Sequence, residues 1–286
     1  MSCVANNFNI VRIILKKSIF DENIIYIILK YYWELLDKRK VLLDWIDKDK
    51  LNWDKLSSNP NAIDLLENNL DKLNWDTLSS NPNAIHLIEN NLDKIDWEEL
   101  SENPNAIELL KNNKDKINWE YICFNPNAVQ LVLERKEVES KLSPEEYYDL
   151  TLNITNINWM IFSGNKNSID FLTKNINYIH WWWLCYNPNA IELLKNNQHK
   201  INWNNLSENP NAIELLKNNP DKINWKNLSK NPNAIELLKN NPDKINWKNL
   251  SKNPNAIELL KNNPDKIDWH LLSVNPSIFV DEPMSF

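Results

Sequence analysis

Apolar residues recur along most of this chain with a period of 22 residues. In most units a tryptophan is followed by leucine three positions later, and an apolar stripe of the form Ala-Ile-x-Leu-Leu comes after it. Residues 223–244 and 245–266 are identical, and one interval between tryptophans is 40 instead of 22. Such internal periodicity is typical of a tandem repeat array and not of two globular domains. The register tryptophans are Trp53, Trp75, Trp97, Trp119, Trp159, Trp181, Trp203, Trp225, Trp247 and Trp269.

Each unit predicts two short helices. The first begins at Asn or Asp, as at Asn52, whose side-chain oxygen can accept a free backbone N–H of the first turn. The second begins at Asn-Pro, as at Asn59 and Pro60, where proline takes the first helical position without losing a hydrogen bond. A leucine-rich repeat has a similar length, but it needs a strand with alternating leucines, whereas Trp-x-x-Leu and Ile-x-Leu-Leu are helical spacings.

One unit buries too few apolar side chains to fold alone, so neighbouring units must stack. We therefore expect an all-α fold, an α-solenoid of stacked 22-residue helical hairpins, shaped as a rod or arc on the order of 100 Å long. The expected organisation is an N-terminal helical cap at 1–46, a first repeat block at 47–133, an irregular or shortened unit at 134–156, a second block at 157–280 and a tail at 281–286.

The N-terminal segment lacks the 22-residue period and predicts apolar helices over 8–19, 24–36 and 42–46. A terminal unit has no neighbour on one side, so a cap that covers this side is the plain interpretation. The alternative is a diverged F-box-like helix pair that recruits host ubiquitin machinery.

The unit W-x-x-L-S-x-N-P-N-A-I-x-L-L-x-x-N-x-x-K-I-[ND] resembles the tandem repeats of uncharacterised proteins of giant viruses, mimivirus-like ones in particular. The resemblance implies a viral protein in the host cytoplasm, and it implies no activity. The sequence departs from the motif at Gly164 and at residues 165–168, where Asn-Lys-Asn-Ser replaces Asn-Pro-Asn-Ala. Regular stacking is in doubt at that point.

Composition argues against an enzyme. The single glycine removes every phosphate-binding loop motif, since these need several glycines. The three cysteines, Cys3, Cys123 and Cys185, and the four histidines share no ligand spacing. We therefore expect no catalytic residue, no cofactor and no metal. No apolar run spans a membrane and no signal peptide is visible, which favours an intracellular protein.

The ten register tryptophans could stack on bases or glycans, but their strict phase with leucine and isoleucine favours core packing. Positions one, two and five after each of them vary most and are expected to face solvent. In the central units these positions change from charged to large apolar residues, which is typical of a partner surface; the alternative is that segment 134–156 covers them. The candidate surface comprises Tyr121, Phe124, Met160, Ile161, Trp182, Trp183 and Tyr186.

Charge also varies along the array. Units near the N-terminus are acidic, whereas Lys226, Lys230, Lys248 and Lys252 form a candidate basic stripe that could meet phosphate. A solvated face is the alternative, and the net charge of −7 favours it. The sequence thus predicts a non-enzymatic scaffold for a protein partner, with the ubiquitin adaptor and a nucleic-acid binder as alternatives.

Overall fold

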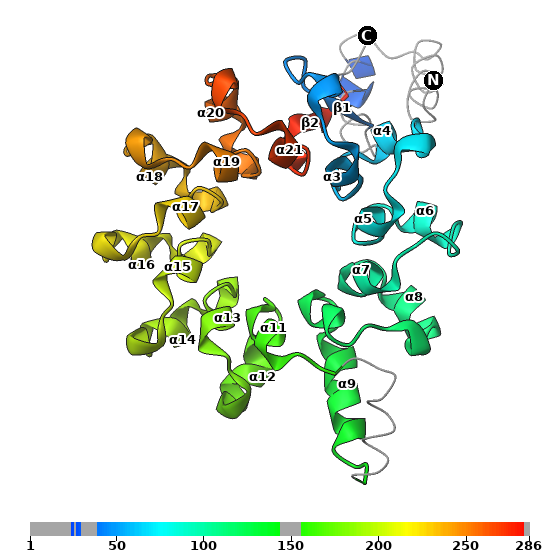
Figure 1. Cartoon of the computed structure of the whole chain (residues 1–286), viewed down its shortest axis with the longest axis vertical. Helices are drawn as coiled ribbons and strands as arrows, with labels where there is room; N and C mark the ends of the chain where they lie inside the picture. Colours follow the sequence, from blue (N-terminus) through cyan, green and yellow to red (C-terminus); the bar gives the residue numbers. More distant parts are fainter. Residues whose placement is uncertain (1–23, 26, 30–38, 144–155, 283–286) are drawn as a thin grey trace.

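The computed structural model describes residues 24, 25, 27–29, 39–143 and 156–282, and the repeats among them form a closed ring (Figure 1). Each unit begins with an inner helix at the register tryptophan, except that the helix of the Trp119 unit begins at Tyr121. In all units but the last, an outer helix then follows the Asn-Pro-Asn-Ala sequence or its equivalent. The described units contain no strand between these helices, which excludes a leucine-rich repeat.

The inner helices are α3 (Trp53–Ser57), α5 (Trp75–Ser79), α7 (Trp97–Glu102), a 3-10 helix (Tyr121–Phe124), α11 (Trp159–Gly164), α13 (Trp181–Leu184), α15 (Trp203–Leu206), α17 (Trp225–Leu228), α19 (Trp247–Leu250) and α21 (Trp269–Leu272). The outer helices are α4 (Ile63–Glu67), α6 (Ile85–Glu89), α8 (Ile107–Asn112), α9 (Val129–Glu139), α12 (Ile169–Lys174), α14 (Ile191–Lys195), α16 (Ile213–Lys217), α18 (Ile235–Lys239) and α20 (Ile257–Lys261). Further 3-10 helices span Lys48–Lys50, Leu70–Lys72, Lys114–Lys116, Ile176–Tyr178, Pro188–Ala190, Gln198–Lys200, Pro210–Ala212, Pro220–Lys222, Pro232–Ala234, Pro242–Lys244, Pro254–Ala256, Pro264–Lys266 and Pro276–Ile278.

A buried asparagine links each unit to the one before it. Asn81 accepts a hydrogen bond from the backbone N–H of Asn83, 3.0 Å away, and so caps the turn that leads into α6. Its amide nitrogen donates to the carbonyl oxygens of Ser57 and Asn59 in the preceding unit, both at 2.9 Å. The first asparagine of the motif makes the same two inter-unit bonds in all ten units, and each of these side chains is at most 5% exposed. We call this set of bonds the asparagine ladder.

The register tryptophans pack against the apolar core, and most of them have a cation over the ring. Lys72, which precedes the next register tryptophan by three residues, places its ammonium 4.7 Å from the Trp53 ring centroid. The same arrangement recurs in most units. At Trp159 the residue in the lysine position is Tyr178, whose ring centroid lies 4.4 Å from the indole. The tryptophans are therefore mostly half-buried, with lysine stems completing their cover.

The first and last units are joined by the same contacts as any other pair. Asn59 donates to the carbonyl oxygens of Ser273 and Asn275, at 2.9 and 3.0 Å. Lys50 lies 5.0 Å from the ring centroid of Trp269. The expected open rod or arc is therefore wrong, because the first unit stacks on the last and the array closes on itself.

Two short strands clasp this seam, and they are the only strands in the described part of the chain. Strand β1 (Lys40–Leu42) pairs antiparallel with β2 (Phe279–Asp281). Beside them the Arg39 guanidinium pairs with the Glu282 carboxylate, and the Glu282 N–H donates to the Arg39 carbonyl oxygen at 2.8 Å. Residues 281 and 282, assigned to a tail from the sequence, thus belong to the clasp.

Closure also changes the interpretation of the N-terminal segment. The expected helix over 42–46 is wrong, because residue 42 ends β1 and the next four residues form a turn. Residues 24, 25 and 27–29 are helical, whereas 8–19 and 30–36 lie outside the described residues. The side of the first unit that a cap was expected to cover is occupied by the last unit.

The 40-residue interval is an insertion into one unit. Asn165 donates to the carbonyl oxygens of Cys123 and Asn125 at 3.0 and 2.9 Å, as it would to an immediate neighbour. The units of Trp119 and Trp159 therefore stack directly, and no shortened unit lies between them in the described part of the chain. The outer helix of the Trp119 unit, α9, is longer than the other outer helices and extends outward from the ring (Figure 1). Stacking is also regular at the departure from the motif, where Ser168 is fully buried.

Substitution of ladder asparagines tests whether the first and last units are bonded as strongly as other neighbours. Asn231→Ala removes the cap and both inter-unit hydrogen bonds, so we expect a loss of about 3 kcal/mol in the free energy of unfolding. Asn59→Ala should cost the same, because Asn59 has the same partners across the seam. Asn233→Ala, which removes an exposed donor from the same motif, should cost less than about 1 kcal/mol. Urea unfolding measures all three, and a cost at Asn59 as small as that at Asn233 would indicate an open array.

Candidate functional site

The most variable positions of the repeat lie on the inner face of the ring. Positions three and four after each register tryptophan, such as Leu206 and Ser207, are fully buried beneath the outer helices. At 100° per residue, positions one, two and five then lie on the opposite side of the inner helix. Because the inner helices form the inner circle (Figure 1), this side is directed at the centre of the ring.

Five aromatic side chains from two units, those of Trp119 and Trp181, make one continuous cluster on this face. The Phe124 ring centroid lies 6.5 Å from that of Tyr121 and 6.0 Å from that of Trp183. Trp182 lies 5.4 Å from Trp183, and Tyr186 lies within 6 Å of both indoles. Most contacts are edge-to-face, the geometry that aromatic pairs prefer. We call these five residues the aromatic cluster.

The aromatic cluster reaches the surface. Phe124 is 42% exposed and Trp182 is 44% exposed. The neighbouring Met160 is 46% exposed, and the other three cluster residues are half-buried. Ile161, which was expected to share this surface, is only 7% exposed and belongs to the core. Position two turns toward the preceding unit in several repeats, where Asn205 is also buried.

An acidic sector lies on the neighbouring units. Burial, and then the charge of Glu99, raises the pKa of Glu102 from 4.5 to about 7. The pKa of Glu99 is also raised, by burial and by the charge of Asp96. Further carboxylates at position one are exposed. The acidic sector comprises Asp54, Asp76, Glu98, Glu99, Glu102 and Glu120.

The candidate basic stripe is divided into two kinds of lysine. Lys226 and Lys248, at position one, are exposed. Lys230, at position five, pairs with Glu208 at 2.8 Å. Burial, and then the charge of Lys230, lowers the pKa of Lys252. The stripe therefore presents fewer free cations than its sequence suggests.

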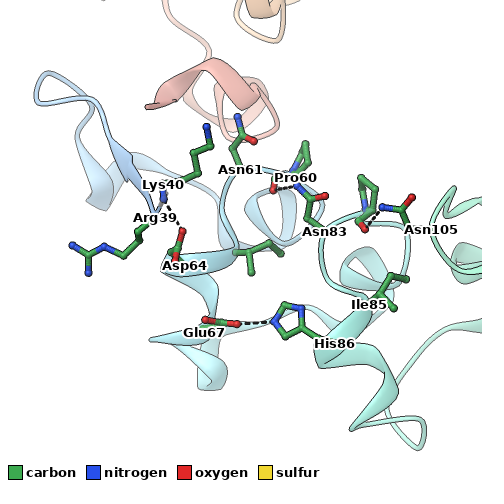
Figure 2. Close-up of a pocket in the computed structure, with 12 residues that line it drawn as sticks. Arg39, Lys40, Pro60, Asn61, Asp64, Glu67, Asn83, Ile85, His86 and Asn105 are labelled. Atoms are coloured by element: carbon green, nitrogen blue, oxygen red, sulfur yellow. Dashed lines mark hydrogen bonds and ion pairs between the residues drawn. The ribbon is translucent and has the colours of Figure 1, made fainter. Parts of the chain in front are cut away.

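Figure 2 shows a polar groove of about 700 Å³ near the seam, between α4, α6 and the Asn-Pro segments. Its side chains already have partners within the protein. Asp64 accepts from the backbone N–H of Lys40 at 2.6 Å, and the Glu67 carboxylate lies 2.6 Å from the His86 ring nitrogen. Asn83 donates to a proline carbonyl oxygen at 2.8 Å. These contacts stabilise the groove and leave no convergent group that points to a ligand.

The two described cysteines have a packing role. Cys123 and Cys185 are fully buried, and burial raises the pKa of the Cys123 thiol to about 12. The Cys185 sulfur accepts from the backbone N–H of Asn202 at 3.3 Å, the role that serine has in most units. Within the described ranges, no three His, Cys, Asp or Glu side chains lie close enough to hold a metal ion. No helix of these ranges has the length and apolar content needed to cross a membrane.

Sequence reasoning missed the residues of the seam clasp and the inter-unit role of the buried asparagines. Arg39 and Glu282 lie far apart in the sequence and outside the periodic part, so no pattern links them. The lysine that covers the tryptophan was visible in the motif, at a fixed distance before the next tryptophan. Comparison with models of protein families, with curated proteins and with solved structures found no match to this chain.

The raised pKa of Glu102 predicts a pH-dependent stability. The folded state holds the proton more tightly than the unfolded state, so the stability from Glu102 is complete below pH 4.5 and is lost as the pH rises through 7. We expect Glu102→Gln to stabilise the protein by about 1 kcal/mol at pH 8, allowing for solvent screening, and to have little effect at pH 4. Urea unfolding at both pH values checks this. Glu89→Gln, an exposed change on α6, should show no such difference.

Proposed function

We propose that this protein is a non-enzymatic repeat scaffold that binds a partner protein through the aromatic cluster on the inner face of its ring. The observation that supports this proposal most is that five aromatic side chains lie in continuous contact while two of them are more than 40% exposed. Exposed apolar patches of this kind mark interaction sites, and tryptophan and tyrosine dominate the energetics of protein interfaces.

The ring supports this role because it is a closed form of an α-solenoid. Each unit is held on both sides, so the aromatic side chains are carried on a rigid wall, and less conformational entropy is lost when a partner binds. The resemblance of the repeat to giant-virus proteins makes a location in the host cytoplasm part of the proposal.

The other two function classes receive less support. The helices assigned to the ubiquitin adaptor lie mostly outside the described residues. For nucleic acid, Lys230 is already paired with a carboxylate, and the acidic sector shares the same face as the lysines. A polyphosphate on the inner face would meet both signs of charge.

The test compares two double variants, each of which truncates two exposed apolar side chains. In the first, Phe124→Ala and Trp182→Ala truncate the exposed side chains of the aromatic cluster. In the second, Leu70→Ala and Ile176→Ala truncate residues that are 54% and 58% exposed outside the inner face. We expect the first variant to weaken binding of the captured partner by about 2 kcal/mol or more, which is roughly 30-fold in Kd, with little change in melting temperature.

The readout is capture of proteins from host-cell lysate by immobilised full-length protein, followed by titration of the captured protein. Binding that is lost in the first variant and kept in the second supports the proposal. Equal capture by both variants, at unchanged melting temperature, overturns it.

A further inference from the structure

The only glycine of the chain lies against the aromatic cluster. Gly164 is at position five of the Trp159 unit, the position that Phe124 and Tyr186 hold in the units on either side. A Cβ atom on Gly164 would lie 3.4 Å from the Trp183 ring, so a larger side chain would compete with the indole for space. The glycine thereby lets Trp183 lie across the Trp159 unit and contact Phe124, at 6.0 Å between ring centroids.

The indoles of the aromatic cluster differ from most register tryptophans because no cation covers them. At Trp203 the ammonium of Lys222 lies 4.7 Å from the ring centroid, and most register tryptophans have such a partner. Among the described residues, no lysine or arginine lies over the ring of Trp182 or Trp183. Since Trp182 is also 44% exposed, part of its π surface is open to a cation from outside.

Carboxylates border the aromatic cluster on the side of the acidic sector. Glu98 and Glu120, both at position one of their units, are exposed. Burial, and then the charges of Glu99 and its acidic neighbours, raise the pKa of Tyr121, so the field of these carboxylates extends over the cluster. A cation on the cluster is therefore favoured both by the indole rings and by the neighbouring negative charges.

We propose, building on the proposed function above, that the partner segment presents an arginine next to an apolar side chain. The guanidinium lies on an indole face of the aromatic cluster, and the apolar side chain packs on Phe124 and Met160, which are 42% and 46% exposed. Arginine suits this surface better than lysine, because its planar and weakly hydrated group stacks on aromatic faces. An acidic segment would be repelled by the border carboxylates.

The probe is a blocked peptide of about nine residues with Leu-Arg-Leu at its centre, neutral polar ends and a fluorine label. In the matched control, citrulline replaces arginine and keeps its shape without the charge. Fluorine NMR with the full-length protein at pH 8 gives both Kd values. We expect the arginine peptide to bind at least about 5-fold more tightly than the citrulline peptide, and this preference to shrink as sodium chloride rises from about 50 to about 500 mM.

Two protein variants separate the ring faces from the carboxylates. Trp182→Leu keeps an apolar side chain but removes an indole, and Glu98→Gln with Glu120→Gln removes two border charges. Each should reduce the preference for arginine over citrulline to less than about 2-fold. The control variant, Glu89→Gln with Asp93→Asn, removes two exposed charges outside the inner face and should keep the full preference.

A further pair of variants tests the role of Gly164. Gly164→Leu should displace the Trp183 indole and weaken binding of both peptides at least about 3-fold. Gly164→Ala should bind nearly as the unchanged protein does, because a Cβ atom at 3.4 Å is in ordinary contact with the indole. Melting temperatures of both variants confirm that the fold is kept. Equal binding by the leucine and alanine variants would show that the glycine does not shape the surface.

Equal affinity of the arginine and citrulline peptides, or no detectable binding up to about 1 mM, would overturn the arginine proposal. A lysine peptide that binds as tightly as the arginine peptide would overturn the choice of a guanidinium. The proposed function would survive any of these results if the partner captured from lysate still depended on Phe124 and Trp182. Peptide binding and lysate capture that both persist unchanged in the Phe124→Ala, Trp182→Ala variant would overturn both proposals.

Discussion

The buried amide of the asparagine ladder is the interaction on which the rest of the structure depends. A fully buried asparagine must satisfy its oxygen and its nitrogen, and at Asn231 the oxygen caps its own unit while the nitrogen donates twice to the unit before. Apolar contacts tolerate sliding, but three simultaneous hydrogen bonds have strict distances and directions. The ladder therefore fixes how one unit is rotated against the next, whereas the leucines beneath it supply most of the burial.

Because every unit repeats this rotation, the shape of the whole follows from the geometry of one boundary. Ten equal steps close a circle at about 36° each, and the seam then repeats the bonds made elsewhere. A ring of eleven units would need a rotation of about 33° between neighbours, and a ring of nine units would need about 40°. A change in the number of units would therefore strain every boundary at once. The identical copies at 223–244 and 245–266 show that a unit can be duplicated in sequence, but the closed ring constrains how many can be kept.

The sequence predicted what depends on local spacing. Asn52 as a cap and proline after Asn59 specify the helices, and the repeat register places equivalent positions of neighbouring units side by side. For that reason Phe124, Trp183 and Tyr186 could be grouped before their contacts were known. Closure could not be predicted, because it depends on a few degrees of rotation that no residue pattern encodes.

Other failures have equally specific causes. Asn59 looks the same in sequence whether its amide nitrogen meets water or a neighbouring carbonyl oxygen, so the ladder was interpreted only as helix capping. Ile161 was placed at the surface because position two varies, yet Ile161 is only 7% exposed, and at the same position Asn205 is buried and donates to the Trp182 carbonyl oxygen of the preceding unit. The 40-residue interval suggested a reduced unit, since spacing alone does not distinguish an insertion from a deletion.

Closure also changes what the charge pattern means. In an open array the acidic and basic units would be distant, and their fields would act on separate parts of a partner. In the ring, α7 and α17 lie on opposite sides (Figure 1), and a circle of ten inner helices about 8–10 Å apart is about 25–30 Å across between helix axes, well beyond the Debye length of about 8 Å at physiological salt. Acidic and basic units therefore attract each other too weakly across the ring to hold it closed, and the hydrogen bonds and strands at the seam must do so. The segregated charges are thus poorly placed to stabilise the ring, and closure depends on the short-range contacts at the seam.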